Sequence, residues 1–244
     1  MRIEILEINA QSPEGLPAIF TPTLVKFTDK TNYLIDCGFT YNYPEFKQEL
    51  EKFGVSIADL TGIIISHDDI DHLEGLHCFK EENAAIKVIS SDAEADSVAG
   101  VIPAERLVQV EGSLNFIPQE MKPMMEGFVK ELKAIKRFPV DSVLKDKEVI
   151  NDTLVVVATP GHTKGHISFY DTASKTVIAA DAIVVEEGEF NIANPQFTLD
   201  MDAALASVER IKSLQPTRII CYHGGIVEDD IQDKLQRLLD RYKQ

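Results

Sequence analysis

A short run of ionisable residues directly behind an apolar segment constrains this chain more than any other feature. The segment Gly62–Ile65 is apolar and mostly β-branched, which is typical of a buried strand. It is followed by Ser66–His72, in which two imidazoles and three carboxylates lie within six residues. Ionisable groups crowded in this way repel one another and are poorly solvated unless a cation compensates them. A metal ion is the simplest such cation.

Three further candidate ligands each follow a short apolar, strand-like run: His162, Asp181 and His223. Strand ends are where α/β proteins place their functional residues. We therefore expect these side chains to meet those of the 66–72 run at one common edge. Imidazole and carboxylate ligands together suit zinc, iron or manganese, and an Asp between two metals can bridge them.

This pattern resembles that of the metallo-β-lactamase superfamily, in which His-x-His-x-Asp-His is followed by a His, an Asp and a final His. The resemblance begins at Asn32–Gly38 and ends at His223, so it covers nearly the whole chain. It implies an α+β protein with a four-layer αββα sandwich, built as a single hydrolase domain over residues 1–244. It also implies a metal-dependent hydrolase with two divalent metal ions, zinc, manganese or iron.

Carried over position by position, the resemblance implies two metal sites. The residues at the ligand positions are His67, Asp69 and His162 at the first site, Asp71, His72 and His223 at the second, and Asp181 between them. The resemblance further implies that Asp71 is catalytic, since it orients the nucleophile. Asp36, which follows an apolar strand, is expected to support the ligands from behind.

The chain departs from the family pattern at Asp69, where a histidine is usual. An ionised carboxylate in place of a neutral imidazole lowers the net charge of a two-metal site from about two to about one. If Asp69 is a ligand, we expect a weaker Lewis acid, a preference for harder ions, and activity that rises toward alkaline pH. If Asp69 does not ligate, the first site is weak or empty.

Composition restricts the partners of the protein. The 24 basic and 40 acidic residues give a net charge of −16 without a basic run, which argues against nucleic acid as a partner. No apolar stretch reaches the ~18 residues of a membrane span, and the N-terminus lacks a signal peptide. Three scattered cysteines fit a reducing compartment. We expect a cytoplasmic protein that acts on a small molecule.

Other polar residues near the candidate ligands are interpreted as structural. His166 lies in a glycine-rich turn after His162, and His77 lies off the helical face that carries His72. Cys221 precedes His223 on the same strand-like run, where it is expected to be a small buried hydrophobe.

Strand-like runs alternate with helix-like segments along the chain. The runs are 2–8, 23–27, 32–36, 62–66, 86–90, 154–158, 167–170, 177–180 and 218–222. Helices are predicted from Pro44 to about Phe53, after His72 to about Phe79, and over 200–214 and 230–242.

A methionine-rich stripe over Met121–Ile135 has helical spacing. It lies in the region 113–145, which either packs on its own domain, covers the metals as a lid, or forms a homodimer contact.

The leading hypothesis is a hydrolase that uses a metal-activated water on a small ester, lactone or thioester. A phosphodiesterase is the first alternative, because His-x-Asp-x-Asp-His resembles the variant in the hydrolase-like domain of DNA-uptake proteins. A non-hydrolytic di-iron redox protein is the second, because flavodiiron proteins also replace a first-site histidine by a carboxylate. Homoserine-lactone hydrolases of this fold commonly carry a tyrosine three residues after the bridging Asp. This chain has Val184 there, which argues against that particular activity.

Overall fold

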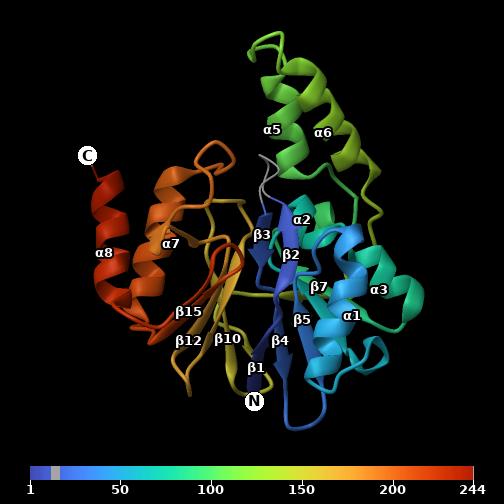
Figure 1. Ribbon diagram of the computed structural model, residues 1–244, viewed down its shortest axis with the longest axis vertical. Helices are drawn as coiled ribbons and strands as arrows, with labels where there is room; N and C mark the ends of the chain where they lie inside the picture. Colours follow the sequence, from blue (N-terminus) through green and yellow to red (C-terminus); the bar gives the residue numbers. More distant parts are fainter. Residues whose placement is uncertain (12–16, 244) are drawn as a thin grey trace.

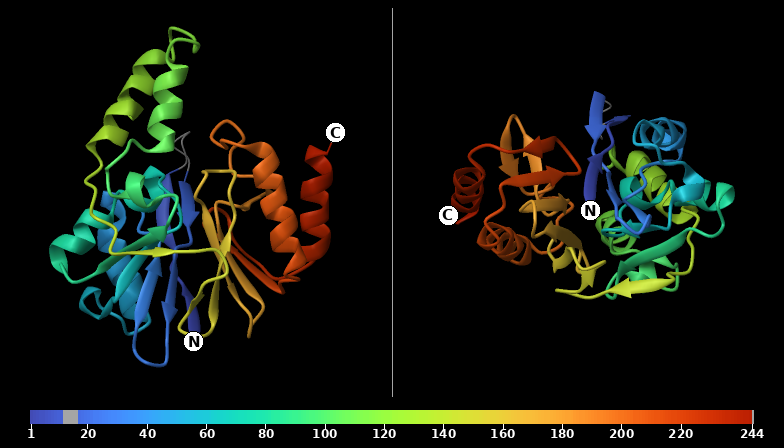
Figure 2. Two further views of the ribbon diagram at one scale, coloured as in Figure 1. Left: turned by 180° about the vertical axis from the view of Figure 1, so that it is seen from behind. Right: turned by 90° about the horizontal axis from the view of Figure 1, so that it is seen from below.

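Two six-stranded sheets face each other, and helices cover both outer faces (Figure 1). The computed structural model describes residues 1–11 and 17–243. Seen from below, the layers follow one another as helices, sheet, sheet and helices (Figure 2). The predicted four-layer αββα sandwich is therefore confirmed.

The first sheet has the order β1-β4-β5-β6-β7-β8. Its strands are β1 (Arg2–Ile5), β4 (Thr23–Lys26), β5 (Asn32–Ile35), β6 (Gly62–Ile65), β7 (Lys87–Ser91) and β8 (Ser142–Leu144). The strands from β5 to β8 are parallel, whereas β1 and β4 run antiparallel to their neighbours. The residues that follow β5 and β6 therefore emerge at one edge of the sheet.

The second sheet has the order β16-β15-β12-β11-β10-β9. Its strands are β9 (Val149–Ile150), β10 (Leu154–Ala158), β11 (Ile167–Asp171), β12 (Thr176–Ala180), β15 (Arg218–Cys221) and β16 (Gly225–Val227). Strands β12 and β15 are parallel, and β10 and β12 are both antiparallel to β11. Consequently β10, β12 and β15 all end at the same edge.

The inner faces of the two sheets share one apolar core. Ile64 of the first sheet and Phe169, Ile178 and Ile220 of the second belong to the same buried cluster. These strands read as continuous apolar runs because each is covered on both faces, by the opposite sheet and by helices. The core thus holds the ends of both sheets close together.

The outer helices follow the predicted periodicity. Helices α1 (Tyr43–Lys52) and α3 (Leu76–Glu82) cover the first sheet, and α7 (Met201–Ser213) and α8 (Ile231–Tyr242) cover the second (Figure 1). In α1, Pro44 lies in the first turn and Phe46 and Leu50 are buried. None of the helices in the described part of the chain combines the length and apolar character that a bilayer crossing requires.

The remaining elements are short. They are η1 (Thr40–Asn42), η2 (Ile57–Asp59), α2 (Ile70–Leu73), α4 (Ala95–Val98), the ribbon of β2 (Ile8–Gln11) and β3 (Pro17–Phe20), and the ribbon of β13 (Val184–Glu186) and β14 (Glu189–Asn191).

The single strand expected over 2–8 is wrong, because the chain forms two strands there. β1 ends at Ile5, the Leu6 amide donates to the Pro22 carbonyl, and β2 then pairs with β3 outside the large sheet. The alternation of side chains continues across this break, so the sequence pattern does not reveal it.

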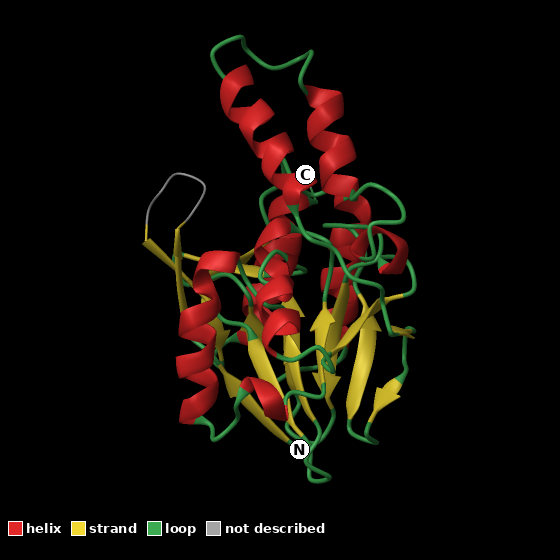
Figure 3. Cartoon of the chain, turned by 90° about the vertical axis from the view of Figure 1, so that its right-hand side faces the viewer, coloured by secondary structure: helices red, strands yellow, loops and turns green. Residues whose placement is uncertain are grey.

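A helical hairpin projects beyond the sandwich (Figure 3). It consists of α5 (Glu105–Ser113) and α6 (Lys122–Ala134). Val110, Val129 and Leu132 join the core on the outer side of the first sheet, whereas Met121 and Met124 near the tip are exposed. The helical segment therefore begins before the predicted bound of 113, and β8 already belongs to the first sheet before 145.

Candidate metal centre

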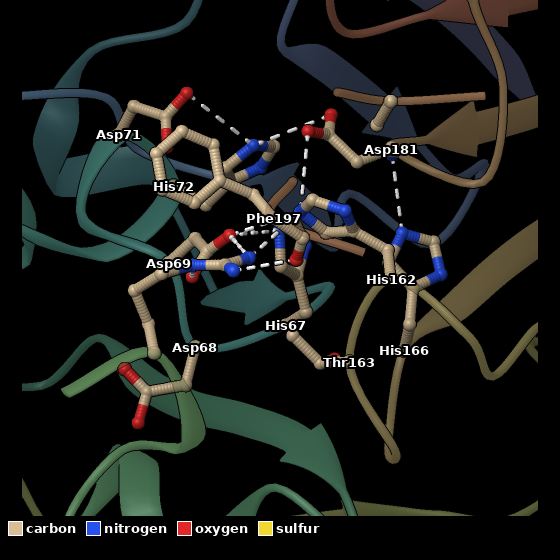
Figure 4. A network of polar contacts seen from close by, with 12 residues as sticks. His67, Asp68, Asp69, Asp71, His72, His162, Thr163, His166, Asp181 and Phe197 are labelled. Carbon is tan, nitrogen blue, oxygen red and sulfur yellow. Dashed lines mark hydrogen bonds and ion pairs between the residues drawn. The ribbon is translucent and has the colours of Figure 1, made fainter. Parts of the chain in front are cut away.

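The ends of β6, β10, β12 and β15 bring all of the predicted ligands together, and most of them are drawn in Figure 4. Their ligand atoms form groups whose members lie within 4.8 Å of one another. The groups are His67 with Asp69 and His162, Asp71 with His72 and His223, and His67 with His72 and Asp181. The first two coincide with the two sites assigned from the sequence.

Asp181 lies between the two groups. Its Oδ1 is 3.4 Å from His72 Nε2, and its Oδ2 is 3.3 Å from His223 Nε2 and 3.8 Å from His162 Nε2. A register shift near the end of β12 and a positive φ of 47° at Ala180 turn this residue toward the centre. The carboxylate therefore faces both groups, as expected for a bridging ligand.

His166 holds Asp181 rather than joining the ligands. Its Nε2 accepts the backbone N–H of Asp181 at 3.1 Å (Figure 4), and its Nδ1 is 2.8 Å from the Thr159 hydroxyl. Burial, His67 and His162 keep the pKa of His166 well below its usual value. His166 is thus a neutral structural residue, in agreement with its interpretation from the sequence.

His77 and Cys221 also lie away from the candidate ligand groups. His77 contacts the Thr40 hydroxyl at 3.1 Å and Glu81 on the outer side of the first sheet. The Cys221 side chain belongs to the buried apolar cluster between the second sheet and its helices. Both are structural residues, as the sequence indicated.

Asp36 orients two of the imidazoles from behind. Its Oδ2 accepts from His72 Nδ1 at 2.9 Å and from the Ser66 hydroxyl at 2.8 Å, and its Oδ1 accepts the Ser66 amide. His67 Nδ1 lies 3.0 Å from the same Ser66 hydroxyl. A proton on each Nδ1 satisfies these contacts, and it leaves the Nε2 atoms of His67 and His72 free to present lone pairs to the centre.

Asp36→Asn is expected to lower zinc affinity by about 10- to 100-fold, the usual effect of losing a partner that orients a metal ligand. Asparagine has no charged oxygen, so its hydrogen bonds to His72 and to the Ser66 hydroxyl would be weaker than those of the Asp36 carboxylate. Competition titration with a zinc chelator measures the change. Asp141→Asn is the control, because Asp141 also accepts a backbone amide but lies beside β8. Equal affinities in the Asp36 variant and the parent would contradict the role of Asp36.

Buried atoms without partners test whether these residues fit a metal ion. His67 Nε2, His72 Nε2 and Asp181 Oδ1 have no hydrogen-bond partner among the described residues. Leaving a buried polar atom unpaired costs about 1–3 kcal/mol, and these three atoms belong to one ligand group. Nitrogen and carboxylate oxygen donors at this spacing fit zinc, manganese or iron.

The carboxylates create a negative potential at the imidazoles. Burial alone would lower the pKa of His72, but Asp71, Asp181 and Asp36 raise it well above its usual value. Burial is likewise outweighed at His223, where Asp181 and Asp71 raise the pKa to about 10. The same attraction favours a divalent cation, which competes with protons for these nitrogens, so metal affinity falls as the pH is lowered.

Sequence reasoning missed a buried cation beside Asp69. The Arg106 guanidinium donates from Nε to Asp69 Oδ1 at 2.9 Å and from Nη2 to Oδ2 at 2.6 Å. Burial would raise the pKa of Asp69, but Arg106 and the hydrogen bonds from His162 and His67 hold it well below its usual range. The charge count that predicted a weaker Lewis acid and an alkaline optimum therefore omitted one positive charge.

Glu94 joins the two ligand-bearing loops. Its Oε1 accepts from the Thr163 hydroxyl and from the Gly165 amide at 3.1 Å, and its Oε2 accepts from the Asp68 amide at 3.3 Å. The side chain is buried, and burial raises its pKa to about 7. No sequence motif marks this residue, because its role depends on contacts with distant loops.

Glu94→Gln is expected to flatten the pH dependence of stability. A folded-state pKa of about 7, above the ordinary 4.5, means that wild-type stability falls as the pH rises through this interval. At 1.36 kcal/mol per pKa unit, the wild type should lose about 2–3 kcal/mol relative to the variant between pH 5 and pH 8. Urea unfolding of both metal-free proteins at the two pH values measures this difference. A constant difference would refute the prediction.

Comparison with known proteins agrees with this geometry. The sequence profile described as the metallo-beta-lactamase superfamily matches residues 21–223. The probable metallo-hydrolase YflN of Bacillus subtilis (strain 168) is 25% identical over 213 residues, which cover 78% of this chain and 74% of the relative. The uncharacterized protein YobT of the same organism is 25% identical over 237 residues, or 93% of each chain.

A solved structure supports the fold independently. The crystal structure of the metallo-beta-lactamase family protein TTHA1429 from Thermus thermophilus has a TM-score of 0.75 at 19% identity. The match covers 99% of this chain and 79% of that chain. Since the superfamily profile spans most of the sequence, including every candidate ligand, this chain belongs to the metallo-β-lactamase superfamily.

Proposed function

We propose that this protein is a metal-dependent hydrolase of small esters, lactones or thioesters, with zinc, manganese or iron as its metal. The observation that carries the proposal is the convergence of His and Asp side chains from both sheets on one edge. Superfamily membership and relatives named probable metallo-hydrolases support the hydrolase class. A bound ion would supply an activated water and polarise the substrate carbonyl.

Asp71 is the proposed catalytic carboxylate. Its Oδ2 lies 3.2 Å from His223 Nε2, and its side chain keeps 21% exposure, so it faces both the ligands and the solvent. Burial would raise its pKa, but His72 and His223 lower it, so the carboxylate is ionised and can accept a proton from water. The Tyr222 hydroxyl donates to the Asp71 carbonyl at 2.7 Å and fixes this backbone position.

An aromatic rim supports an uncharged substrate. The Phe20 ring meets His223 edge-on with centroids 4.9 Å apart, and Phe39 stacks on Tyr41 at 5.1 Å. Phe20 and Phe39 are 6.0 Å apart, so the rings are continuous, and Tyr41 is exposed. The exposed Tyr41 and the partly buried Phe39, rather than the methionines at the hairpin tip, offer apolar contact on this side of the centre, and the buried Phe20 packs behind them.

The basic residues at the 66–72 loop do not favour a polyanion. Arg106 pairs with Asp69, and Arg137 pairs with Asp68 at 2.7 Å. Recognition of a phosphate backbone requires cations that are free to bind it. Because both arginines are already paired, they do not favour the phosphodiesterase alternative, and the small acyl substrate remains our proposal.

A substrate panel tests the proposal. Short and medium acyl esters, lactones, thioesters, bis-(p-nitrophenyl) phosphate and single-stranded DNA are assayed with zinc, manganese or iron. Because each buried methylene contributes about 0.8 kcal/mol, kcat/KM for esters should rise up to about fourfold per methylene. Preferential cleavage of the phosphodiesters would favour the phosphodiesterase. Absence of hydrolysis, with bound iron that changes colour on reduction, would favour the redox protein.

A further inference from the structure

The Arg106 guanidinium contacts two of the atoms that a first metal ion would need. Its Nη2 is 2.6 Å from Asp69 Oδ2 and 3.3 Å from His162 Nε2. Those two atoms are themselves 2.9 Å apart, and together with His67 they form the first ligand group. A positive charge supplied by the chain therefore already lies against this group.

The guanidinium is held in place on several sides. Its Nη1 donates to the Phe197 carbonyl and to Gln109, and its Cζ lies 5.0 Å from the centre of the Phe197 ring. Arg106 is only 3% exposed, and Figure 4 includes Phe197 in the same polar network as Asp69 and the imidazoles. Moving this side chain away would break a bidentate ion pair and leave Asp69 buried without its cation.

The second ligand group lacks a comparable cation. Asp71 and Asp181 pair with histidines, and no lysine or arginine forms an ion pair with either one in the described ranges 1–11 and 17–243. Asp71 of this group and Asp181, which faces both groups, therefore remain uncompensated by a permanent positive charge, whereas Asp69 of the first group is neutralised. The attraction for a metal cation is therefore greatest where Asp71 and Asp181 meet His72 and His223.

We propose that Arg106 takes the place of a second metal ion, so that the protein binds one divalent ion tightly, at Asp71, His72, Asp181 and His223. This inference rests on the proposed metal-dependent function and specifies its stoichiometry. A second ion at the first group has to compete with the guanidinium for Asp69 and His162. Repulsion by the nearby guanidinium and the neutralisation of Asp69 both weaken that binding.

Arg106→Met tests this proposal, because methionine keeps an unbranched apolar side chain without charge. Arg137→Met is the matched control: Arg137 pairs with Asp68 on the same loop, but Asp68 belongs to no ligand group. Metal-free parent and variants are titrated with zinc chloride by calorimetry, and bound zinc is counted by elemental analysis after gel filtration. Circular dichroism establishes that each protein is folded.

The parent and the Arg137 variant should bind one zinc ion tightly and a second at least tenfold more weakly. Arg106→Met should raise the affinity of the second ion by tenfold or more and bring the zinc content to two per chain. Weaker second-ion binding in Arg106→Met would overturn the inference, because it would show that Arg106 supports ligation by Asp69. Two equally tight ions in the parent would overturn it as well.

A double variant keeps the inference testable if Arg106→Met does not fold. Asp69→His combined with Arg106→Met removes both members of the ion pair and leaves no unpaired charge. It should bind two zinc ions tightly, and a single tight ion would overturn the inference. If zinc, manganese and iron all fail to bind to the folded proteins in the same titration, the proposed metal-dependent function itself is overturned, which distinguishes that failure from the failure of Arg106 as the competing cation.

Discussion

Asp181→Asn is expected to remove the bound metal and to lower kcat/KM for the preferred ester by about a thousandfold or more. The carboxylate faces His72, His162 and His223, and asparagine would place a neutral amide there. A metal ion stabilises transition-state charge by several kcal/mol, and about 4 kcal/mol corresponds to a factor of 10³ in rate. Steady-state kinetics and elemental analysis of the purified variant measure both effects.

Asp171→Asn is the control for this variant. Asp171 is also a buried aspartate of the second sheet, but it ends β11 at the opposite edge and accepts from Ala173 and Ser174. Its replacement should leave the metal content unchanged. Parent-like metal content and activity in Asp181→Asn would remove this residue from the centre.

Gly161→Ala is expected to lower the free energy of unfolding by about 3–5 kcal/mol and to displace His162. Gly161 has a φ of 138°, and an added Cβ would lie 2.3 Å from the Ala204 backbone nitrogen at the start of α7. Backbone strain and overpacking each cost about 1–3 kcal/mol, and the Asp200 amide donates to the Gly161 carbonyl, which ties the loop to the start of the helix. Urea unfolding measures the loss of stability.

Gly127→Ala provides the opposite case. Gly127 lies inside α6, and an added Cβ would meet no atom within 4 Å. Alanine should therefore stabilise the protein by about 0.5–1 kcal/mol through its higher helix propensity. A Gly161 variant as stable as the parent would show that the loop can move relative to α7.

The positions of the candidate ligands were predictable because the information is local. Each ligand follows an apolar run that forms a strand, and parallel strands such as β12 and β15 end at one edge. The superfamily and the four-layer sandwich were predicted from the same local patterns, and both are confirmed. The role of Asp36 as a partner of His72 also follows from its place at the end of β5.

Arg106 could not be predicted from its own surroundings. It lies 37 residues after Asp69, in the first turn of a helix whose apolar periodicity says nothing about a polar residue facing a distant loop. The region 113–145 marked from the sequence leaves out nearly all of α5 for a related reason. The methionine stripe identified α6 but not α5, which carries Arg106 to the centre.

A bound ion would also restrict the unfolded chain, because its ligands come from both sheets. An ion held by His72 and His223 would close a loop of about 150 residues, which includes β7 and β8 of the first sheet and all strands of the second sheet except β16. In the chain-entropy view, a covalent cross-link over a loop this long stabilises a protein by about 4–5 kcal/mol, because it restricts the unfolded ensemble. The ion would then act as a reversible cross-link as well as a reagent, and a chelator would allow the two halves of the sandwich to separate at lower temperature.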